Sequence, residues 1–416
     1  MKKVYFKTFG CRTNQFDTQV MMSRLKDFEL TMSESDADMI VVNSCTVTNG
    51  ADSSVRAYIN RANRRNPDVK IVLAGCGSHS KGEGLFEAKK VFGVMGHSEK
   101  ENINSILKNK TPFYEIGDLK HIDSTIVERF IGKSRAFIKI QEGCDFECSY
   151  CIIPSVRGNA RSHSEDNVLT QIEKLATNGF GEFILTGTNV GSYGKDINSS
   201  MAKLLKKISL IRGVRRVRIG SLEPVQIDDE FKELLKEPWM AKHLHIALQH
   251  TSDKMLEVMN RRNSFKDDIE LLQEISSIGY AIGTDYIVGH PQEDEDVWRE
   301  AIKRVEMLPL THIHAFTYSK RDGTISASMK DEVRGDIAKR RHKELTAIIK
   351  EKNFLFRKKN TKGLDILVEN GKDGLYYGYD QHFNKIEIKS SDDLSGNWVH
   401  IDNAVVEEDK NVAIFE

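Results

Sequence analysis

The chain has 416 residues and no formal net charge, because 61 lysine and arginine residues balance 61 aspartate and glutamate residues. This length predicts two or three domains, and a composition of 39% hydrophobic and 29% charged residues is ordinary for a globular protein. No apolar run is long enough to predict a membrane helix, and the N-terminal residues lack the apolar core of a signal peptide. We therefore expect a cytoplasmic protein with reduced cysteines. Because the net charge is zero, the chain as a whole has no strong electrostatic field that would attract a polyanionic partner.

Residues 1–110 predict an open α/β (Rossmann-like) domain. Apolar runs at 3–9, 39–44 and 69–75 are typical of buried parallel strands, and segments 14–28 and 50–65 are typical of helices. A cysteine follows each predicted strand within two residues. These N-terminal cysteines are Cys11, Cys45 and Cys76. Because ligands bind beyond the carboxyl ends of strands in such sheets, we expect the three thiols to converge.

Residues 111–134 predict a connector, and residues 135–357 predict a partial (βα)6 barrel. Its six expected strands lie at 135–141, 182–187, 214–220, 243–249, 281–288 and 312–318. Polar motifs cluster where these strands end, which is where βα barrels have their active sites. The first strand leads into the motif EGCDFECSYC, with the spacing C-x3-C-x2-C. Its barrel cysteines are Cys144, Cys148 and Cys151.

Residues 358–416 predict a small all-β barrel of five short strands. A change of charge marks the boundary: residues 330–362 contain 12 lysine or arginine residues and 5 acidic residues, whereas residues 363–416 contain 4 lysines and 12 acidic residues. The basic segment favours contact with RNA, and the acidic tail weakens that interpretation.

Two sets of three cysteines predict two metal centres, each with one open position. Structural zinc sites have four protein ligands. His79, three residues after Cys76, is the one histidine placed to complete such a site with three cysteines. Buried free thiols are the alternative that needs no metal. Thiolates suit iron–sulfur clusters, and three cysteines on a 4Fe–4S cluster leave one iron free for a small molecule.

The spacing C-x3-C-x2-C after the first strand of a partial barrel resembles the signature of radical S-adenosylmethionine (SAM) enzymes. Further segments resemble the methylthiotransferases within that group, in order and spacing along nearly the whole chain. They are TFGCRTNQFDTQ, VVNSCTVTNGAD, LAGCGS, EGCDFECSYCIIPSVRG, LTGTNVGSYG, SLEP and MNRRNSF. The tail resembles the TRAM module of these enzymes. The segment NSCTVTNGAD and the basic helix after it are most similar to the subgroup that modifies N6-threonylcarbamoyladenosine of tRNA.

The resemblance implies two 4Fe–4S clusters and two molecules of SAM. The barrel cysteines would hold the cluster at which SAM yields a 5′-deoxyadenosyl radical, which takes hydrogen from C2 of the adenine. The N-terminal cysteines would hold the cluster that carries the sulfur of the new methylthio group. Cofactors rather than protein side chains would then carry the catalysis. The implied partners are the tRNA anticodon stem-loop, a reducing electron donor such as flavodoxin or ferredoxin, and a sulfur donor, with no membrane.

Several positions depart from the family pattern. They are Asn159, His163, Thr251, His290 and Gln292. None of them is a cysteine, so the implied class of reaction is unaffected. The departures fall in segments that the resemblance implies for contact with SAM and substrate.

Polar residues at strand ends are candidates for contact with SAM or substrate. They are Thr186, Asn189, Ser221, Glu223 and Gln249. Hydrogen bonding within loops is the alternative for each, because such residues favour turns. Asn14 and Asp17, just after Cys11, are interpreted as helix caps.

Basic side chains predict two surfaces for RNA phosphates. One surface lies on the helix expected at 50–65 and comprises Arg56, Arg61, Arg64 and Arg65. The other lies beside the tail and comprises Arg340, Arg341, Lys343, Lys358 and Lys359. A solvated helix face is the alternative for both.

The favoured hypothesis is a methylthiotransferase that acts at C2 of N6-threonylcarbamoyladenosine next to the anticodon. Two alternatives share its chemistry, with isopentenyladenosine of tRNA or an aspartate of a ribosomal protein as substrate. Two others belong to different classes, a non-catalytic iron–sulfur electron carrier and an RNA-binding protein. Cleavage of SAM distinguishes the enzymes from both of these.

Overall fold

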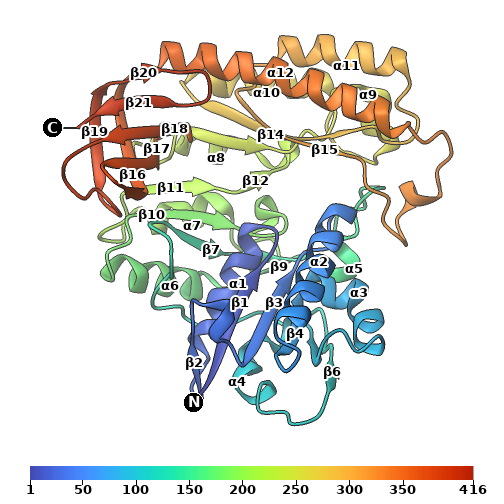
Figure 1. The fold of residues 1–416 in the computed structure, drawn as a ribbon. Helices are drawn as coiled ribbons and strands as arrows, with labels where there is room; N and C mark the ends of the chain where they lie inside the picture. Colours follow the sequence, from blue (N-terminus) through green and yellow to red (C-terminus); the bar gives the residue numbers. More distant parts are fainter. Residues whose placement is uncertain (416) are drawn as a thin grey trace.

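The computed structural model describes residues 1–415. Three groups of strands follow one another along the chain (Figure 1): a blue N-terminal sheet, a green and yellow barrel, and a red C-terminal sheet. The N-terminal and C-terminal sheets lie on different sides of the barrel. Within residues 1–415, no helix combines the length and apolar character needed to cross a membrane.

The N-terminal sheet is parallel and has the strand order β2-β1-β3-β4-β5-β6. Its strands are β1 (Lys2–Thr8), β2 (Phe28–Leu30), β3 (Met39–Ser44), β4 (Lys70–Gly75), β5 (Gly93–Met95) and β6 (Phe113–Glu115). The three strands predicted here correspond to β1, β3 and β4. The others have three residues each, which is too short to show a hydrophobic period. The last of them, β6, lies in the segment that we expected to be a connector.

Four helices accompany this sheet. They are α1 (Arg12–Ser23), α2 (Asn49–Arg65), α3 (Cys76–Glu87) and α4 (Ile103–Ile106). Helix α2 begins after Thr48, whose hydroxyl accepts a hydrogen bond from Ala51 N–H. It ends at Arg65, because Asn66 precedes Pro67 and a residue before proline disfavours the helical conformation.

All six predicted barrel strands are present and parallel. They are β7 (Ala136–Lys139), β10 (Glu182–Thr186), β11 (Arg216–Ile219), β13 (His243–Ile246), β14 (Ala281–Val288) and β15 (His312–Thr317). A short strand β12 (Ser221–Leu222) continues β11 beyond Gly220. Because β11 pairs with β10 and β12 pairs with β13, this interrupted strand joins the two halves of the open barrel.

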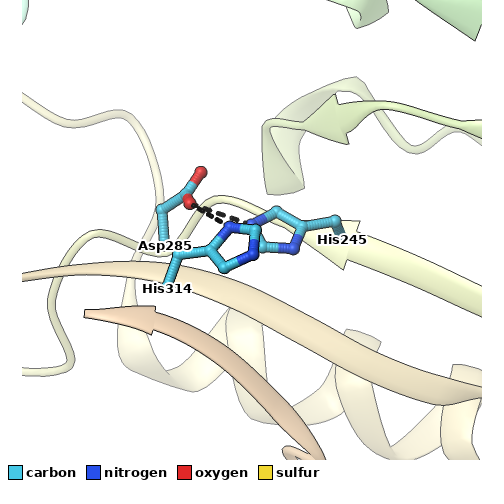
Figure 2. A group of neighbouring side chains, drawn as sticks. All are labelled: His245, Asp285 and His314. Atoms are coloured by element: carbon cyan, nitrogen blue, oxygen red, sulfur yellow. Dashed lines mark ion pairs between the residues drawn. The ribbon is translucent and has the colours of Figure 1, made fainter. Parts of the chain in front are cut away.

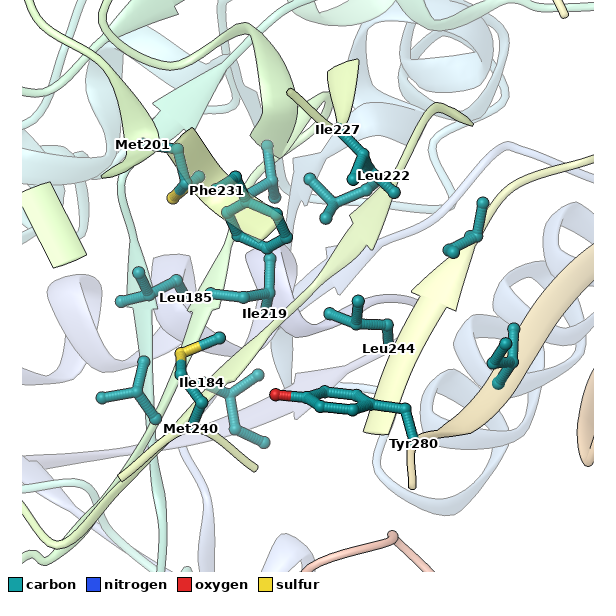
Figure 3. Packing of buried hydrophobic residues seen from close by; sticks show 14 of the residues in the cluster. Ile184, Leu185, Met201, Ile219, Leu222, Ile227, Phe231, Met240, Leu244 and Tyr280 are labelled. Carbon is teal, nitrogen blue, oxygen red and sulfur yellow. The ribbon is translucent and has the colours of Figure 1, made fainter. Parts of the chain in front are cut away.

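Helices cover the outside of the barrel strands. They are α6 (Glu165–Thr177), α7 (Met201–Ile208), α8 (Asp229–Leu234), α9 (Asp253–Val258), α10 (Phe265–Ser277) and α11 (Glu295–Met307). Except for α9, their apolar faces meet side chains of the strands in one large core. Met255 of α9 packs with Ile287 and Val297 in a smaller cluster. Figure 3 shows part of this core, where Ile219 and Leu244 from neighbouring strands pack together with Tyr280.

The C-terminal sheet contains the five predicted strands and one more. They are β16 (Lys362–Lys372), β17 (Leu375–Tyr379), β18 (Lys385–Lys389), β19 (Trp398–Asn403), β20 (Val405–Val406) and β21 (Asn411–Ile414). The order is β19-β16-β17-β18-β21-β20, and β18 pairs with β21 in parallel. The sheet curls around its own apolar core (Figure 1). The two-residue strand β20 was not predicted.

A 25-residue helix, α12 (Gly335–Lys359), leads from the barrel to the C-terminal sheet (Figure 1). Its buried Leu345 and Ile349 belong to the barrel core, and the helix packs against β14 and β15. The basic segment at the predicted boundary is therefore a helix with one face in the core rather than a flexible linker.

Two arginines of β11 fasten the C-terminal sheet to the barrel. Glu182 on β10 accepts a hydrogen bond from Arg216 Nε at 2.6 Å and from Arg218 Nε at 2.8 Å. The rest of each guanidinium donates to backbone carbonyl groups of the C-terminal sheet, including Asp365 O at 2.8 Å from Arg216 and Asp380 O at 2.5 Å from Arg218. The barrel and the C-terminal sheet therefore meet through two arginines whose guanidinium groups are fixed by Glu182.

Replacing Leu345 by alanine should lower the free energy of unfolding by about 2–5 kcal/mol, because it leaves a cavity under α12. Chemical denaturation followed by circular dichroism measures the change. Leu355→Ala is the matched control, since Leu355 lies on the same helix and is 50% exposed. It should change stability by less than about 0.5 kcal/mol. Equal losses in the two variants would contradict the packing of α12 described above.

Candidate active site

All six cysteines line one cavity of about 390 Å³ between the N-terminal sheet and the barrel. The N-terminal cysteines reach it from the carboxyl ends of β1, β3 and β4, and the barrel cysteines reach it from the loop after β7 and β8 (Gln141–Glu142). Residues more than 130 positions apart in the sequence, such as Cys11 and Cys144, therefore lie on the walls of one space. The three N-terminal thiols therefore lie together, as the sequence predicted, and the three barrel thiols line the same cavity.

The N-terminal cysteines depend on a tight approach of two loops. Cys11 is the residue before α1, and Cys76 is the first residue of α3. Gly10 has a backbone φ of +91°, and a Cβ atom there would lie 2.7 Å from Cys45 Cβ. Only glycine accommodates both the backbone conformation and the contact, so Gly10 allows the loops of Cys11 and Cys45 to meet.

Hydrogen bonds hold the loop of the barrel cysteines in place. Cys144 N–H donates to Gly158 O at 3.0 Å. Ser149, between the second and third cysteines, accepts a hydrogen bond from the Ser326 hydroxyl at 2.8 Å. His290 Nε2 lies 2.8 Å from the same Ser326 oxygen. His290, which departs from the family pattern, therefore supports the cysteine loop from behind.

Burial keeps several of these thiols protonated when no metal is bound. It raises the pKa of Cys45 to about 11 and that of Cys151 to about 12, and it also raises the pKa of Cys76 and Cys144. A buried thiolate requires a compensating positive charge, which a bound metal ion supplies. Six thiols around one cavity are therefore a donor set that fits two iron–sulfur clusters.

Four of the five polar residues proposed for SAM or substrate line the cavity, namely Asn189, Ser221, Glu223 and Gln249. The fifth, Thr186, is absent from the lining, and its hydroxyl lies 3.5 Å from that of Thr13. Gln249 has a left-handed backbone with a φ of +66°, an uncommon conformation that is often found at functional sites. Asn189 Nδ2 lies 3.5 Å from Cys144 Sγ.

Arg261, which was not predicted as a site residue, lies in the motif MNRRNSF and contacts both Glu223 and Cys148. Its Nη1 donates to Glu223 at 2.9 Å and lies 3.5 Å from Cys148 Sγ. Burial raises the pKa of Glu223, and the charge of Arg261 opposes that effect. The motif was a usable signal, but a neighbour of Cys148 more than 100 residues away could be identified only in the folded chain.

A second group of polar side chains lies on three adjacent barrel strands (Figure 2). Asp285 on β14 contacts both His245 on β13 and His314 on β15, with distances of 3.0 and 3.3 Å from its Oδ1 to the imidazole nitrogens. The two imidazole rings stack on each other, with 4.8 Å between centroids. Burial alone would raise the pKa of Asp285, but the two histidines bring it well below its usual range. Asp285 also lines the cavity, so the group extends the polar wall around Ser221.

Buried charges fill the interface beneath the cavity. We call these six residues the interface charge cluster: Asp17, Lys100, Asp123, Lys139, Glu142 and Arg157. Lys139 Nζ on β7 lies 2.5 Å from Asp17 Oδ1 on α1 and 3.1 Å from Glu142 Oε2. Burial alone would raise the pKa of Glu142, but Lys100, Lys139 and Arg157 hold it well below its usual range. Three cations and three carboxylates thus join the N-terminal sheet to the barrel.

The interpretation of Asn14 and Asp17 as helix caps is wrong. Cys11 occupies the N-cap position of α1, and its side chain makes no capping hydrogen bond. Asn14 Nδ2 instead donates to Phe9 O and Ser44 O, each at 2.9 Å, which ties α1 to two loops of the sheet. Asp17 belongs to the interface charge cluster.

His79 does not complete a zinc site with the N-terminal cysteines. It is absent from the residues that line the cavity, and its ring stacks on that of His97 with 5.2 Å between centroids. Burial lowers the pKa of His79 to about 4. The ring therefore acts as a neutral packing element.

The basic residues proposed for RNA have different surroundings. Arg56, Arg61, Arg64 and Arg65 are exposed on α2, and Lys343, Lys358 and Lys359 are exposed on α12. Arg340 is exposed too but forms an ion pair with Glu295 at 3.0 Å. The prediction that Arg341 contacts RNA is wrong, because Arg341 is 2% exposed and its guanidinium pairs with Glu293 at 2.9 Å. A buried, paired arginine is not available to an RNA phosphate.

Comparison with known proteins agrees with this site. Residues 3–96 match the uncharacterized protein family UPF0004, and residues 138–305 match the radical SAM superfamily. A Helicobacter pylori (strain J99) protein, assigned by name to the methylthiotransferases without a stated substrate, is 54% identical and covers all of both chains. The threonylcarbamoyladenosine tRNA methylthiotransferase MtaB of Aquifex aeolicus is 34% identical, covering 88% of this chain and 92% of the relative. The tRNA-2-methylthio-N(6)-dimethylallyladenosine synthase of Fervidobacterium nodosum is 33% identical, covering 91% and 90%.

Solved structures share the fold. The radical SAM methyltransferase TsrM from Kitasatospora setae, with cobalamin and a [4Fe-4S] cluster bound, aligns with a TM-score of 0.60 at 16% identity. The alignment covers 79% of this chain and 77% of that chain. Radical SAM methylthiotransferases use SAM and two 4Fe–4S clusters, which agrees with two sets of three cysteines on one cavity. The chain belongs to the radical SAM methylthiotransferase family.

Proposed function

We propose that the protein adds a methylthio group to C2 of N6-threonylcarbamoyladenosine in the anticodon stem-loop of tRNA. The observation that carries the methylthio chemistry of the proposal is the single cavity lined by both cysteine sets. In this assignment, Cys144, Cys148 and Cys151 bind the cluster that binds SAM, and Cys11, Cys45 and Cys76 bind the second cluster. When bound, the clusters and SAM supply the hydrogen abstraction and the methylthio group.

The protein's own residues bind, orient and shield the reactants. Arg261 fixes the carboxylate of Glu223 at the wall, where the amide groups of Asn189 and Gln249 offer hydrogen bonds to SAM or to the edge of the base. The apolar part of the lining excludes water, which protects a radical from stray hydrogen donors.

A flipped base requires a surface on which to stack. Phe316 lines the cavity and is 44% exposed, so its ring suits this role. His314, on the same face of β15 two residues earlier, has a side chain that is 63% exposed. A polar imidazole beside the stacking surface suits the polar threonylcarbamoyl substituent better than an apolar dimethylallyl group.

The tRNA assignment also draws on the relatives, because both the Aquifex and the Fervidobacterium proteins are named for tRNA nucleosides. The exposed arginines of α2 and lysines of α12 suit the phosphates of a stem-loop. We assign residues 1–110, together with β6 of the following segment, to the cluster-binding domain, residues 135–357 to the radical SAM barrel and residues 358–416 to a TRAM module. An electron donor such as flavodoxin or ferredoxin and a sulfur donor complete the proposal.

Single cysteine variants separate the two proposed clusters. Cys148→Ala should abolish production of 5′-deoxyadenosine from SAM, because the first cluster loses a ligand. Cys45→Ala should retain part of that cleavage but yield no methylthio nucleoside. Liquid chromatography with mass spectrometry measures both products in one assay, and each variant is the control for the other. Normal cleavage in Cys148→Ala, or full product from Cys45→Ala, would refute the corresponding assignment.

Mass spectrometry of nucleosides from bulk tRNA, with and without the gene, identifies the substrate. The expected result of deletion is loss of the 2-methylthio derivative of threonylcarbamoyladenosine, restored by the intact gene but not by Cys45→Ala. Loss of the dimethylallyl counterpart would assign a different adenosine. An unchanged nucleoside profile would overturn the tRNA assignment and direct the search to ribosomal protein.

Charge reversal on α2 tests the RNA surface. The double variant Arg56→Glu, Arg64→Glu should bind an anticodon stem-loop more weakly than the parent, and its affinity should depend less steeply on salt, because fewer counterions are released. Fluorescence anisotropy at several salt concentrations measures both effects. Lys236→Glu, in the turn just after α8, is the control and should bind as the parent does. Equal weakening by the control would indicate a nonspecific effect of charge.

A further inference from the structure

Arg157 comes from the barrel, but its side chain reaches the N-terminal cysteines. It is the last residue of α5 (Ile153–Arg157), the short helix that follows the barrel cysteines. Its Nε lies 3.2 Å from Cys76 Sγ. Its Nη1 donates to Glu142 at 2.6 Å, and its Nη2 lies 3.1 Å from Asp17. One guanidinium thus contacts a cysteine of one set and a carboxylate two residues before the other set.

The surroundings of Cys76 make this contact strong. Cys76 is 3% exposed and packs against Ile152 and Val156 in a small apolar cluster. Arg157 is itself 2% exposed. A charge-assisted hydrogen bond gains strength where water is excluded, because the local dielectric constant is low.

The other partners of Arg157 fix its direction. Glu142 and Asp17 hold two of its nitrogens, and Asn14 Oδ1 accepts a further hydrogen bond from Nη2. These contacts leave Nε aimed at the sulfur. The guanidinium is therefore preorganised and does not have to reorient when the charge on the sulfur changes.

We propose that Arg157 is a positioning residue that sets the reduction potential of the iron–sulfur centre held by the N-terminal cysteines, through its hydrogen bond to Cys76. This inference rests on the proposed function, in which Cys76 is a ligand of that centre. Hydrogen bonds to the sulfurs of a cluster and nearby positive charge both favour its reduced, more negative form. Because Arg157 belongs to the barrel loop, the potential depends on how the barrel and the N-terminal sheet are docked.

The test uses the full chain with Cys144→Ala, Cys148→Ala and Cys151→Ala, so that only the centre on the N-terminal cysteines remains. After anaerobic reconstitution with iron and sulfide, a redox titration followed by electron paramagnetic resonance gives the potential. Adding Arg157→Gln should lower the equilibrium constant for one-electron reduction at least tenfold, which is a shift of about 59 mV to more negative potential. A residue that only supported the fold would change cluster content without changing the potential.

Two further variants control this result. Arg157→Lys keeps the charge but loses the planar guanidinium and should give a smaller shift in the same direction. Arg161→Gln is the matched control, because Arg161 lies 3.7 Å from Glu142 and donates to backbone carbonyl groups but has no contact with a sulfur among the described hydrogen bonds. It should leave the potential unchanged.

The outcomes separate this inference from the proposed function. If the triple cysteine variant binds no iron, the assignment of Cys11, Cys45 and Cys76 fails. If it binds iron and Arg157→Gln has the parent potential, or Arg161→Gln shifts it equally, only the role of Arg157 is overturned. If Arg157→Gln cannot be loaded with iron, the potential of the Arg157→Lys variant tests the proposal instead. An unchanged potential in Arg157→Lys refutes the role of Arg157.

Discussion

The interface charge cluster is the constraint on which the rest of this site depends. It places Asp17 of α1 against Lys139 of β7, and Glu142 of β8 against Arg157 of α5. Removal of one member would leave a buried charge without its partner, which typically costs about 3–5 kcal/mol. An apolar interface would tolerate sliding, whereas paired buried charges satisfy one another in only one arrangement. The two cysteine sets face one cavity because this arrangement fixes the barrel against the N-terminal sheet.

The same arrangement gives each cysteine set an arginine neighbour. Arg157 lies beside Cys76, and Arg261 lies beside Cys148, and each arginine also pairs with a glutamate, Glu142 or Glu223 respectively. Positive charge next to a sulfur offsets the burial that raises the thiol pKa of Cys76. The folded chain therefore places a positive charge beside one sulfur of each cysteine set before any metal is bound.

The far side of the barrel is organised by the same kind of chemistry. Arg216 and Arg218 use Glu182 as a common carboxylate partner and donate their remaining N–H groups to backbone carbonyl groups of the C-terminal sheet. Phe383, from the turn between β17 and β18, lies with its ring centroid 5.2 Å from that of His243 on β13. The acidic C-terminal sheet is thus held in a fixed position relative to the cavity, and α12 braces the connection.

The sequence by itself determined the local elements and the type of chemistry. Hydrophobic periodicity located the long strands and α2, and cysteine spacing identified both sets of thiols, because these signals lie within short segments. Strands of two or three residues, such as β5 and β20, carry too few positions for a period and were missed. Only the tertiary structure decided which polar residues meet. It brought Arg157 to Cys76 and Arg261 to Cys148, and it buried Arg341 against Glu293, because contacts between distant segments depend on how whole elements pack and not on local pattern.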